Sequence, residues 1–162
     1  MTLEYEKAWA KYRSGLRILQ TPLICWDLIT TYYSDSFLMN KIQKNWNEKI
    51  NFLSIVNDQK REIIVTDKNF KIIFATETIV NMNGYEPSEI IGKSPGFFQG
   101  NATSKKTKNS IKKALINLKP FKEVILNYKK NGETYWCEID AHPKFDAQGN
   151  FVNYIAFERL AS

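Results

Sequence analysis

The residues of this 162-residue chain that could do chemistry are few and widely separated. Glu138 and Asp140 lie two positions apart on an expected strand, where side chains share one face, so they could act as paired carboxylates in acid–base work. The sequence offers no second acid pair or metal ligand set beside them, which predicts solvated strand residues. The single histidine, His142, precedes Pro143 at the end of that strand and is expected to be an ordinary surface histidine on its outer face.

Nucleophilic and phosphate-binding motifs are missing from the sequence. No Ser/His/Asp spacing or nucleophile elbow is present. The glycines between positions 84 and 100 form no phosphate loop, because no strand leads into a G-x-G-x-x-G or G-K-S/T run. Cys25 and Cys137 cannot build a disulfide framework or a four-ligand zinc site, so we interpret them as buried free thiols in a reducing compartment. These patterns predict that the chain is not an enzyme.

The net charge of +6 is unevenly distributed, because no acidic residue lies between Glu89 and Glu123. The lysines of that interval are Lys93, Lys105, Lys106, Lys108, Lys112, Lys113 and Lys119. Such a stretch could bind a polyanion, but it lacks interleaved aromatic residues and any DNA-reading motif. The prediction is a solvated helix face, with no nucleic acid as partner.

The chain has enough apolar residues, 43%, for a packed core. No apolar run approaches the roughly 18 residues that span a bilayer. The first residues, MTLEYEKAWAKYR, mix acids and bases without the apolar region of a secretory signal. The expectation is a cytoplasmic protein without a membrane anchor.

The N-terminal third is predicted to be helical. Residues 3–20 carry apolar side chains at helical spacing, Thr21-Pro22 interrupts them, and residues 23–34 and 37–52 again favour helix. These segments are rich in large apolar side chains, and leaving those in water costs about 25 cal/mol per Å². The N-terminal third must therefore bury one face against something.

The pattern changes to strands after residue 61. Residues 62–67 and 71–76 form β-branched runs around a turn at Asp67-Lys68-Asn69. Short helical turns follow, and then a helix capped by Thr103 or Ser104 runs to about Leu118. Three further strands are expected over residues 122–129, 134–142 and 151–160. This order predicts an α+β architecture, with a five-stranded antiparallel sheet and helices over one face.

The segment 80–99, VNMNGYEPSEIIGKSPGFFQ, carries the most specific local signals in the chain. Asn83-Gly84 is a turn dipeptide, because glycine adopts positive φ without steric cost. Pro87 fits the first turn of a short helix, and Gly92 fits its end.

This segment resembles the GY-x-x-x-E-x-x-G core of PAS domains. The GKSPGFFQG run that ends it resembles the flavin-binding LOV branch of that family, whose motif is G-x-N-C-R-F-L-Q. The resemblance covers about residues 60–160. It implies a PAS domain over residues 56–162, preceded by an N-terminal helical extension over residues 1–55.

The LOV resemblance implies a flavin site whose main chemical groups have been replaced. The cysteine that forms the light-driven bond to flavin corresponds to Pro95, and the adjacent phosphate-binding arginine corresponds to Gly96. A second phosphate arginine corresponds to Lys112, which can pair with phosphate without the planar fork. Gln99 is retained. Adduct photochemistry is therefore not expected.

At three strand positions that face the cofactor in the LOV branch, this chain keeps one of the residues typical of that branch and replaces the other two. Asn127 matches the first asparagine, Cys137 replaces the second, and Glu158 replaces a glutamine. The candidate pocket residues are thus Asn127, Gln99, Cys137, Glu158 and Lys112, with Phe97 and Phe98 as walls. The substitutions disfavour FMN as the native cofactor. Haem is disfavoured more strongly, because the helix after residue 103 has no histidine. The cofactor, if there is one, stays open.

The opposite face of the sheet is expected to be apolar as well. Its residues are Val124, Leu126, Tyr128, Trp136, Ile155 and Phe157. A single domain would not leave such a face in water. The hypothesis is that the N-terminal helices cap this face and form a homodimer interface.

The leading functional hypothesis is a sensory or signalling PAS module that senses a small ligand or mediates protein–protein interaction and dimerisation. The alternative is a cysteine-less, LOV-like flavin sensor that responds by photoreduction or redox change. No output domain follows the last strand in this sequence; if the sequence is that of the whole protein, the signal is expected to pass to an unidentified partner protein or through self-association.

Overall fold

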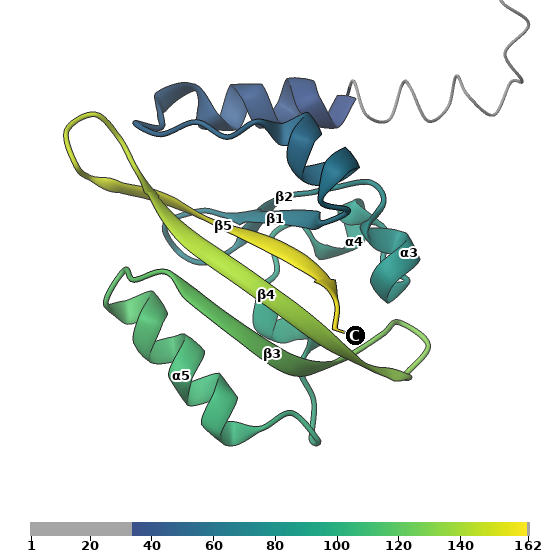
Figure 1. Cartoon of the computed structure of the whole chain (residues 1–162). Coiled ribbons are helices and arrows are strands. Elements are labelled where there is room, and N and C mark those ends of the chain that lie inside the picture. The colour runs from purple at the N-terminus through teal and green to yellow at the C-terminus, as the bar shows by residue number, and fades with distance from the viewer. Residues whose placement is uncertain (1–33, 162) are drawn as a thin grey trace, which may run out of the picture. The chain divides into compact units, whose positions relative to one another are not determined.

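Five strands form one antiparallel sheet in the computed structural model, which describes residues 34–161. The strand order is β2-β1-β5-β4-β3, so the two ends of the domain's sequence meet in the middle of the sheet (Figure 1). The strands are β1 (Glu62–Thr66), β2 (Ile72–Ala75), β3 (Phe121–Tyr128), β4 (Thr134–Phe145) and β5 (Phe151–Leu160). The predicted α+β class and five-stranded antiparallel sheet are confirmed.

The turns between strands follow the chemistry expected of their residues. The Asp67 carboxylate accepts hydrogen bonds from the backbone N–H groups of Asn69 and Lys71, both at 2.8 Å. Strand β4 runs three residues beyond its predicted end, through Pro143. This extension is tolerated because β3 pairs with β4 only as far as Ala141, so the proline lies where β4 has a free edge.

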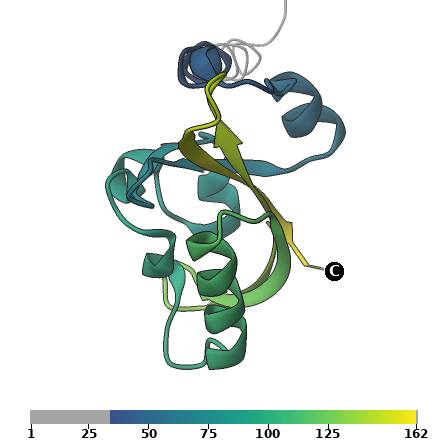
Figure 2. The same ribbon diagram turned by 90° about the vertical axis from the view of Figure 1, so that its left-hand side faces the viewer.

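Short helices and one longer helix lie on one side of the sheet (Figure 2). They are α3 (Ile79–Asn83), α4 (Pro87–Ile90), the 3-10 turn η3 (Pro95–Phe98) and α5 (Lys105–Ile116). Gly84, at φ 78°, ends α3 in the left-handed conformation that favours glycine. The Ser104 hydroxyl caps α5 by accepting from the Thr107 N–H at 3.3 Å. Thr103, the other expected cap, instead donates to the Leu126 carbonyl on β3.

The main hydrophobic core lies between the inner face of the sheet and these helices. Its buried members are Ile64, Ile72, Ala75, Ile79, Met82, Ile90, Phe98, Ile125, Tyr135 and Cys137. Helix α5 contributes no buried residue to it, and its Ile111 is only partly buried. The longest helix of the PAS region therefore contacts the sheet without a fully buried side chain of its own.

The segment before the sheet does not form the single helix predicted over residues 37–52. Residues 34–42 are helical, followed by η1 (Gln43–Asn45), an extended stretch, and the π-helical turn η2 (Ser54–Asp58). The helix ends because Trp46 adopts an extended backbone, and its indole N–H donates to the Asn153 side chain of β5 at 2.8 Å. The Asn47 N–H donates to the Phe145 carbonyl of β4. Contacts with the sheet override the local preference for helix.

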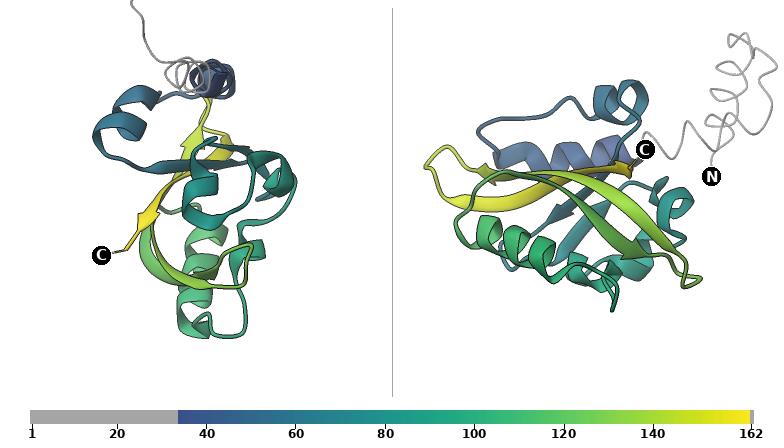
Figure 3. Two further views of the ribbon diagram at one scale, coloured as in Figure 1. Left: turned by 90° about the vertical axis from the view of Figure 1, so that its right-hand side faces the viewer. Right: turned by 60° about the horizontal axis from the view of Figure 1, so that its bottom comes forward.

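This segment covers part of the outer face of the sheet (Figure 3). Met39, Trp46 and Phe52 are buried, and the Phe52 ring meets Phe74 of β2 at 6.2 Å between centroids. Beneath the segment, Ile63 and Val65 of β1 and Ile155 of β5 are fully buried.

The outer face of β3 and β4 carries no such cover among residues 34–161. Val124 is 46% exposed and Trp136 is 56% exposed. The helices predicted over residues 3–20 and over most of 23–34, together with Cys25, lie outside the described residues. The domain boundary expected at residues 55/56 stays a prediction.

Candidate ligand pocket

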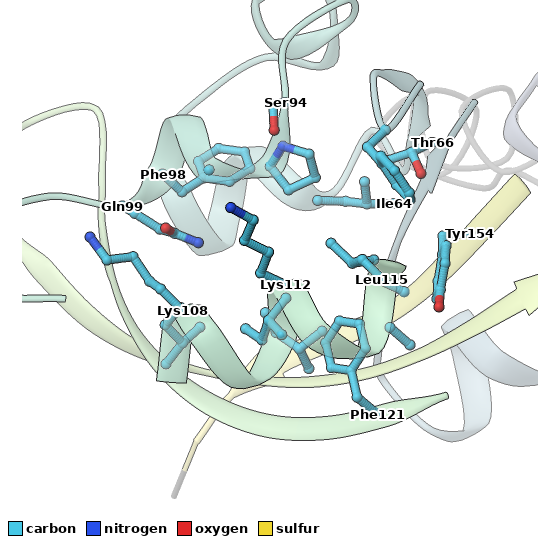
Figure 4. A pocket seen from close by; sticks show the side chains of 18 of the residues that line it. Ile64, Thr66, Ser94, Phe98, Gln99, Lys108, Lys112, Leu115, Phe121 and Tyr154 are labelled. Atoms are coloured by element: carbon cyan, nitrogen blue, oxygen red, sulfur yellow. The ribbon is translucent and has the colours of Figure 1, made fainter. Parts of the chain in front are cut away.

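A pocket of about 240 Å³ lies between the inner face of the sheet and the helices α5 and η3 (Figure 4). Apolar and aromatic side chains dominate its lining. They include Ile64, Phe70, Phe98, Ile111, Leu115, Phe121, Ile125, Ile139 and Tyr154. An apolar pocket with a few polar groups is typical of a small-molecule site, although this volume is below the roughly 300–1,000 Å³ of most drug-sized sites.

Two buried polar atoms of the lining lack hydrogen-bond partners among the residues described. They are the Asn127 Oδ1 atom on β3 and the Thr66 Oγ1 atom on β1. Asn127 is 4% exposed and Thr66 is 5% exposed. An unpaired buried polar group costs about 1–3 kcal/mol, so each unpaired group needs an explanation. A ligand or water molecule in the pocket would supply a partner for both atoms, and the neighbouring Tyr135 hydroxyl, also unpaired, is a second source for Asn127.

Glu158 of β5 is the carboxylic acid of the pocket lining, and it is 4% exposed. Burial raises its pKa to about 7, against a smaller lowering effect from the Cys137 thiol, which donates to the Glu158 Oε2 atom at 3.5 Å. Glu62, its cross-strand neighbour on β1, adds a small raising effect. The carboxyl group can therefore either donate or accept a hydrogen bond near neutral pH.

The thiol of Cys137 is poorly suited to act as a nucleophile. Burial, and then the neighbouring Glu158 charge, raise the pKa of this thiol far above its usual range. Cys137 is fully buried in the core and does not line the pocket. The wall at Ser94, Pro95 and Gly96 also brings no thiol to the pocket.

Two lysines of α5 stand at the pocket opening. Figure 4 shows Lys108 and Lys112 extending from the helix toward the wall formed by Ser94, Phe98 and Gln99. Neither lysine has an ion-pair partner among residues 34–161. Residues four apart on a helix are neighbours, so this like-charged pair is mildly destabilising. The opening is consequently electropositive.

The structure brings together five of the seven residues expected at the site. Asn127, Gln99, Glu158, Lys112 and Phe98 all line the pocket.

The other two expected residues lie outside the lining. Cys137 lies beneath Glu158 in the core. Phe97 is 40% exposed, with its ring against Tyr85 at 5.1 Å and beneath the Lys93 ammonium at 3.9 Å. Tyr85 and Lys93, which do not line the pocket, hold the Phe97 ring outside it, while the Phe98 ring beside it at 5.6 Å lines the pocket.

Sequence reasoning missed Lys108, Thr66 and Tyr154. Lys108 lies one helical turn before Lys112, and Thr66 alternates with Ile64 on the inner face of β1, so helix and strand periodicity could have indicated both. Tyr154 lies four residues before Glu158 on the same face of β5, so strand alternation could have indicated it as well.

The carboxylates outside the pocket serve structural roles. Glu138 is not the solvated strand residue that was predicted. It bridges Arg61 at 2.9 Å and Arg159 at 2.8 Å, and these partners lower its pKa to about 2. Asp140 accepts from His142 at 2.7 Å. Within the described part of the chain, no group of three or more His, Cys, Asp or Glu side chains is placed to hold a metal ion.

The order of the strands, the short helices on one side of the sheet and the pocket between them together define a sensory domain of the PAS class. The family model described as "PAS domain" matches residues 61–159, and the chain belongs to this family.

Two relatives that match this region carry the name of a blue-light-activated histidine kinase. The chain is 33% identical over 85 residues to a "Blue-light-activated histidine kinase" of Brucella canis, which covers 52% of this chain and 17% of the kinase. It is 39% identical over 85 residues to the protein of the same name in Brucella anthropi, again over 17% of that kinase. The chain thus spans only about a sixth of the length of these relatives.

Solved structures of the LOV branch share the fold. A light-oxygen-voltage domain studied with a flavin analogue superimposes with a TM-score of 0.63 at 26% identity, over 68% of this chain and 84% of that one. The dark structure of the Aureochrome1 LOV domain gives a TM-score of 0.64 at 23% identity, over 72% of this chain and 86% of that one. Of the helices between residues 34 and 161, none is long and apolar enough to cross a membrane.

Proposed function

We propose that this PAS domain senses a small molecule held in the pocket between the sheet and α5. The observation that carries this proposal is the pair of unpartnered buried atoms, Asn127 Oδ1 and Thr66 Oγ1, in an otherwise apolar lining. Burying both without a partner would reduce stability with no compensating contact. A bound molecule with polar groups opposite Asn127 and Thr66 would explain why the pocket contains these two unpaired atoms.

Helix α5 is the element that would respond to the ligand. It contributes no buried residue, yet Ile111 and Leu115 face the pocket. A ligand that fills the pocket adds apolar contacts to both side chains and holds the helix against the sheet. Binding shifts the helix only if the ligand has higher affinity for the closely packed state.

Thermal unfolding in the presence of a small-molecule library tests this proposal. Stabilising compounds should raise the Tm of the wild-type chain but not that of the Ala156→Phe variant, whose added ring occupies the pocket. The matched control is Asn131→Ser, in the exposed turn between β3 and β4, and it should respond to the compounds as the wild type does. The neighbouring Gly132 is unsuitable as a control position, because its φ of 87° would strain a serine. Compounds that stabilise the wild type and Ala156→Phe equally would contradict binding in this pocket.

The second candidate is flavin binding without the adduct thiol. Asn127 and Glu158 could hydrogen-bond a flavin ring, and Gln99 and Lys112 lie at the opening where a phosphate would emerge. The fit is incomplete. The pocket volume of about 240 Å³ is small for a three-ring cofactor with its side chain, and Phe70, Phe121 and Tyr154 occupy part of the space. Flavin entry would require α5 to move outward.

Reconstitution with FMN separates the two candidates. We expect the purified chain to be colourless and to lose added FMN on desalting. A yellow protein with structured blue absorption would favour the flavin candidate. Even then, illumination should bleach the flavin by photoreduction rather than by a thiol adduct, because Pro95 and Gly96 line the wall where the thiol would be needed.

The output of the domain is proposed to pass through contacts with other proteins. The relatives' names describe blue-light activation and histidine kinase activity, and this chain matches only about a sixth of their length. We propose that the domain itself is not catalytic and that it acts in the cytoplasm. It would signal to an unidentified partner or through a homodimer built on the N-terminal helices and the outer face of the sheet.

A further inference from the structure

The charges and unpaired groups around the pocket are distributed in a way that restricts the chemistry of its ligand. We propose that the pocket binds a small aromatic carboxylate, with its anionic group between Lys108 and Lys112 and a hydroxyl or N–H donor directed at Asn127. This inference rests on the proposed function, since it specifies the ligand of the same pocket.

The anionic end is inferred from the two lysines of α5. They lie four residues apart on one helix face, line the opening, and have no carboxylate partner among residues 34–161. Bringing an anion between them removes their mutual repulsion. Lys105 and Lys113 lie on the same helix but do not line the pocket. The helix therefore offers two lysines at the pocket and two away from it for comparison.

The aromatic body is inferred from the walls. Phe98 of η3, Phe121 of β3, and Phe70 before β2 present rings to the pocket, and aromatic pairs contribute beyond the area that they bury. The small volume, about 240 Å³, fits a single substituted ring better than a fused cofactor.

The donor at the inner end is inferred from Asn127. Its Oδ1 atom is an acceptor, and a donor on the ligand would pair with it in competition with the neighbouring Tyr135 hydroxyl, which is also unpaired. The Glu158 carboxyl group, which also lines the pocket, can accept from a second donor on the ligand or give a proton to an acceptor on it.

Calorimetric titration with three matched probes tests the assignment. The probes are 4-hydroxyphenylacetate, its neutral amide, and phenylacetate, which lacks the hydroxyl donor. We expect 4-hydroxyphenylacetate to bind the wild type most tightly. The amide and phenylacetate should each bind about fivefold more weakly, because each lacks one of the two polar contacts.

Paired variants locate the contacts. Lys108→Gln/Lys112→Gln should abolish the preference for the carboxylate over the amide, whereas Lys105→Gln/Lys113→Gln, with the same change in net charge, should keep it. Asn127→Leu should abolish the preference for the hydroxylated probe. Equal binding of acid and amide to the wild type, or an acid preference that survives Lys108→Gln/Lys112→Gln, would overturn the proposal.

Failure of all three probes is also decisive. If none binds while another small molecule stabilises the wild type and not Ala156→Phe, the ligand class is wrong and the proposed function stands. If no compound of any class distinguishes the wild type from Ala156→Phe, both the ligand class and the proposed function fail.

Discussion

Glu158 is the residue whose protonation depends most on its surroundings in the pocket. At the position that the LOV resemblance aligns with a neutral glutamine, this chain buries a carboxyl group beside the Cys137 thiol, and burial raises the pKa of Glu158 to about 7. The group is therefore partly protonated under ordinary conditions. Its hydrogen-bonding character changes with pH, which a glutamine cannot do.

The first prediction concerns the pH dependence of stability. Because the pKa of Glu158 rises from 4.5 in the unfolded chain to about 7 in the folded one, the folded state binds more protons between these values. The free energy of unfolding should therefore fall as pH rises from about 4.5 to 7, by roughly 3 kcal/mol from this group. Glu158→Gln removes this term and should stabilise the protein at pH 8 relative to the wild type.

Urea denaturation of both proteins at pH 5 and pH 8 measures this effect. Asp35, whose pKa is raised to about 6 chiefly by burial, contributes a slope of the same sign but is present in both proteins, so it cancels in the difference. Glu138→Gln provides a control that should lower stability but leave the difference between pH 5 and pH 8 nearly unchanged. Its pKa is lowered to about 2 by Arg159 and Arg61, so its charged form is already favoured at both pH values. An equal pH slope in the wild type and Glu158→Gln would contradict the buried-carboxyl account.

Among the elements, the segment 34–58 shows where local sequence signals give way to tertiary contacts. Its helical periodicity predicted a continuous helix over residues 37–52, but the backbone becomes extended at Trp46 so that the indole can reach Asn153. A sequence window cannot show a partner 107 residues away. By contrast, Gly84, Pro87 and Ser104 act within a few residues of themselves, and the turns and caps predicted from them are present.

The second prediction tests the link between this segment and the sheet. Trp46→Phe keeps the aromatic ring but removes the indole donor, leaving the Asn153 Oδ1 atom buried without its partner. The free energy of unfolding should fall by about 1–3 kcal/mol. Phe37→Ala, at a side chain that is 71% exposed on the same segment, should change it by no more than about 0.5 kcal/mol.

Equilibrium urea unfolding, followed by circular dichroism, provides the measurement. A Trp46→Phe variant as stable as the wild type would mean that the segment is not anchored through this hydrogen bond. In that case the cover over β1 and β5 would depend on Met39 and Phe52 packing alone.

The candidate site could be predicted from the sequence only in part, for reasons that differ by residue. Asn127, Gln99 and Lys112 were found because strand alternation and the family motif fix which way they face. Phe97 was misplaced because its partners, Tyr85 and Lys93, draw it away from the pocket. Neither the pocket's volume nor the unpaired state of Asn127 can be predicted without knowing how tightly α5 packs.

For the whole molecule, the uncovered outer face of β3 and β4 raises the question of assembly. Val124 and Trp136 are about half exposed there, and they lie diagonally across the β3–β4 pair. The segment 34–58 contacts β1, β2, part of β5 and the end of β4. A second copy of the chain is the proposed occupant of the uncovered part.

The third prediction follows from this assembly. Trp136→Arg places a charge in the proposed interface and should convert a dimer to a monomer at micromolar concentration, as measured by light scattering after size-exclusion chromatography. Ile116→Arg is the control, because Ile116 is 67% exposed on α5, away from that face. A dimer that persists in Trp136→Arg, or a wild-type chain that is monomeric throughout, would contradict the proposal.

The most direct test of the central claim is mass spectrometry of the small molecules that this chain carries through native purification. The account predicts that denaturing the wild type releases a small aromatic acid in near-stoichiometric amount, and that Ala156→Phe, purified in parallel, releases none. Release of FMN by the wild type, or of the same molecules by both proteins, would contradict the account.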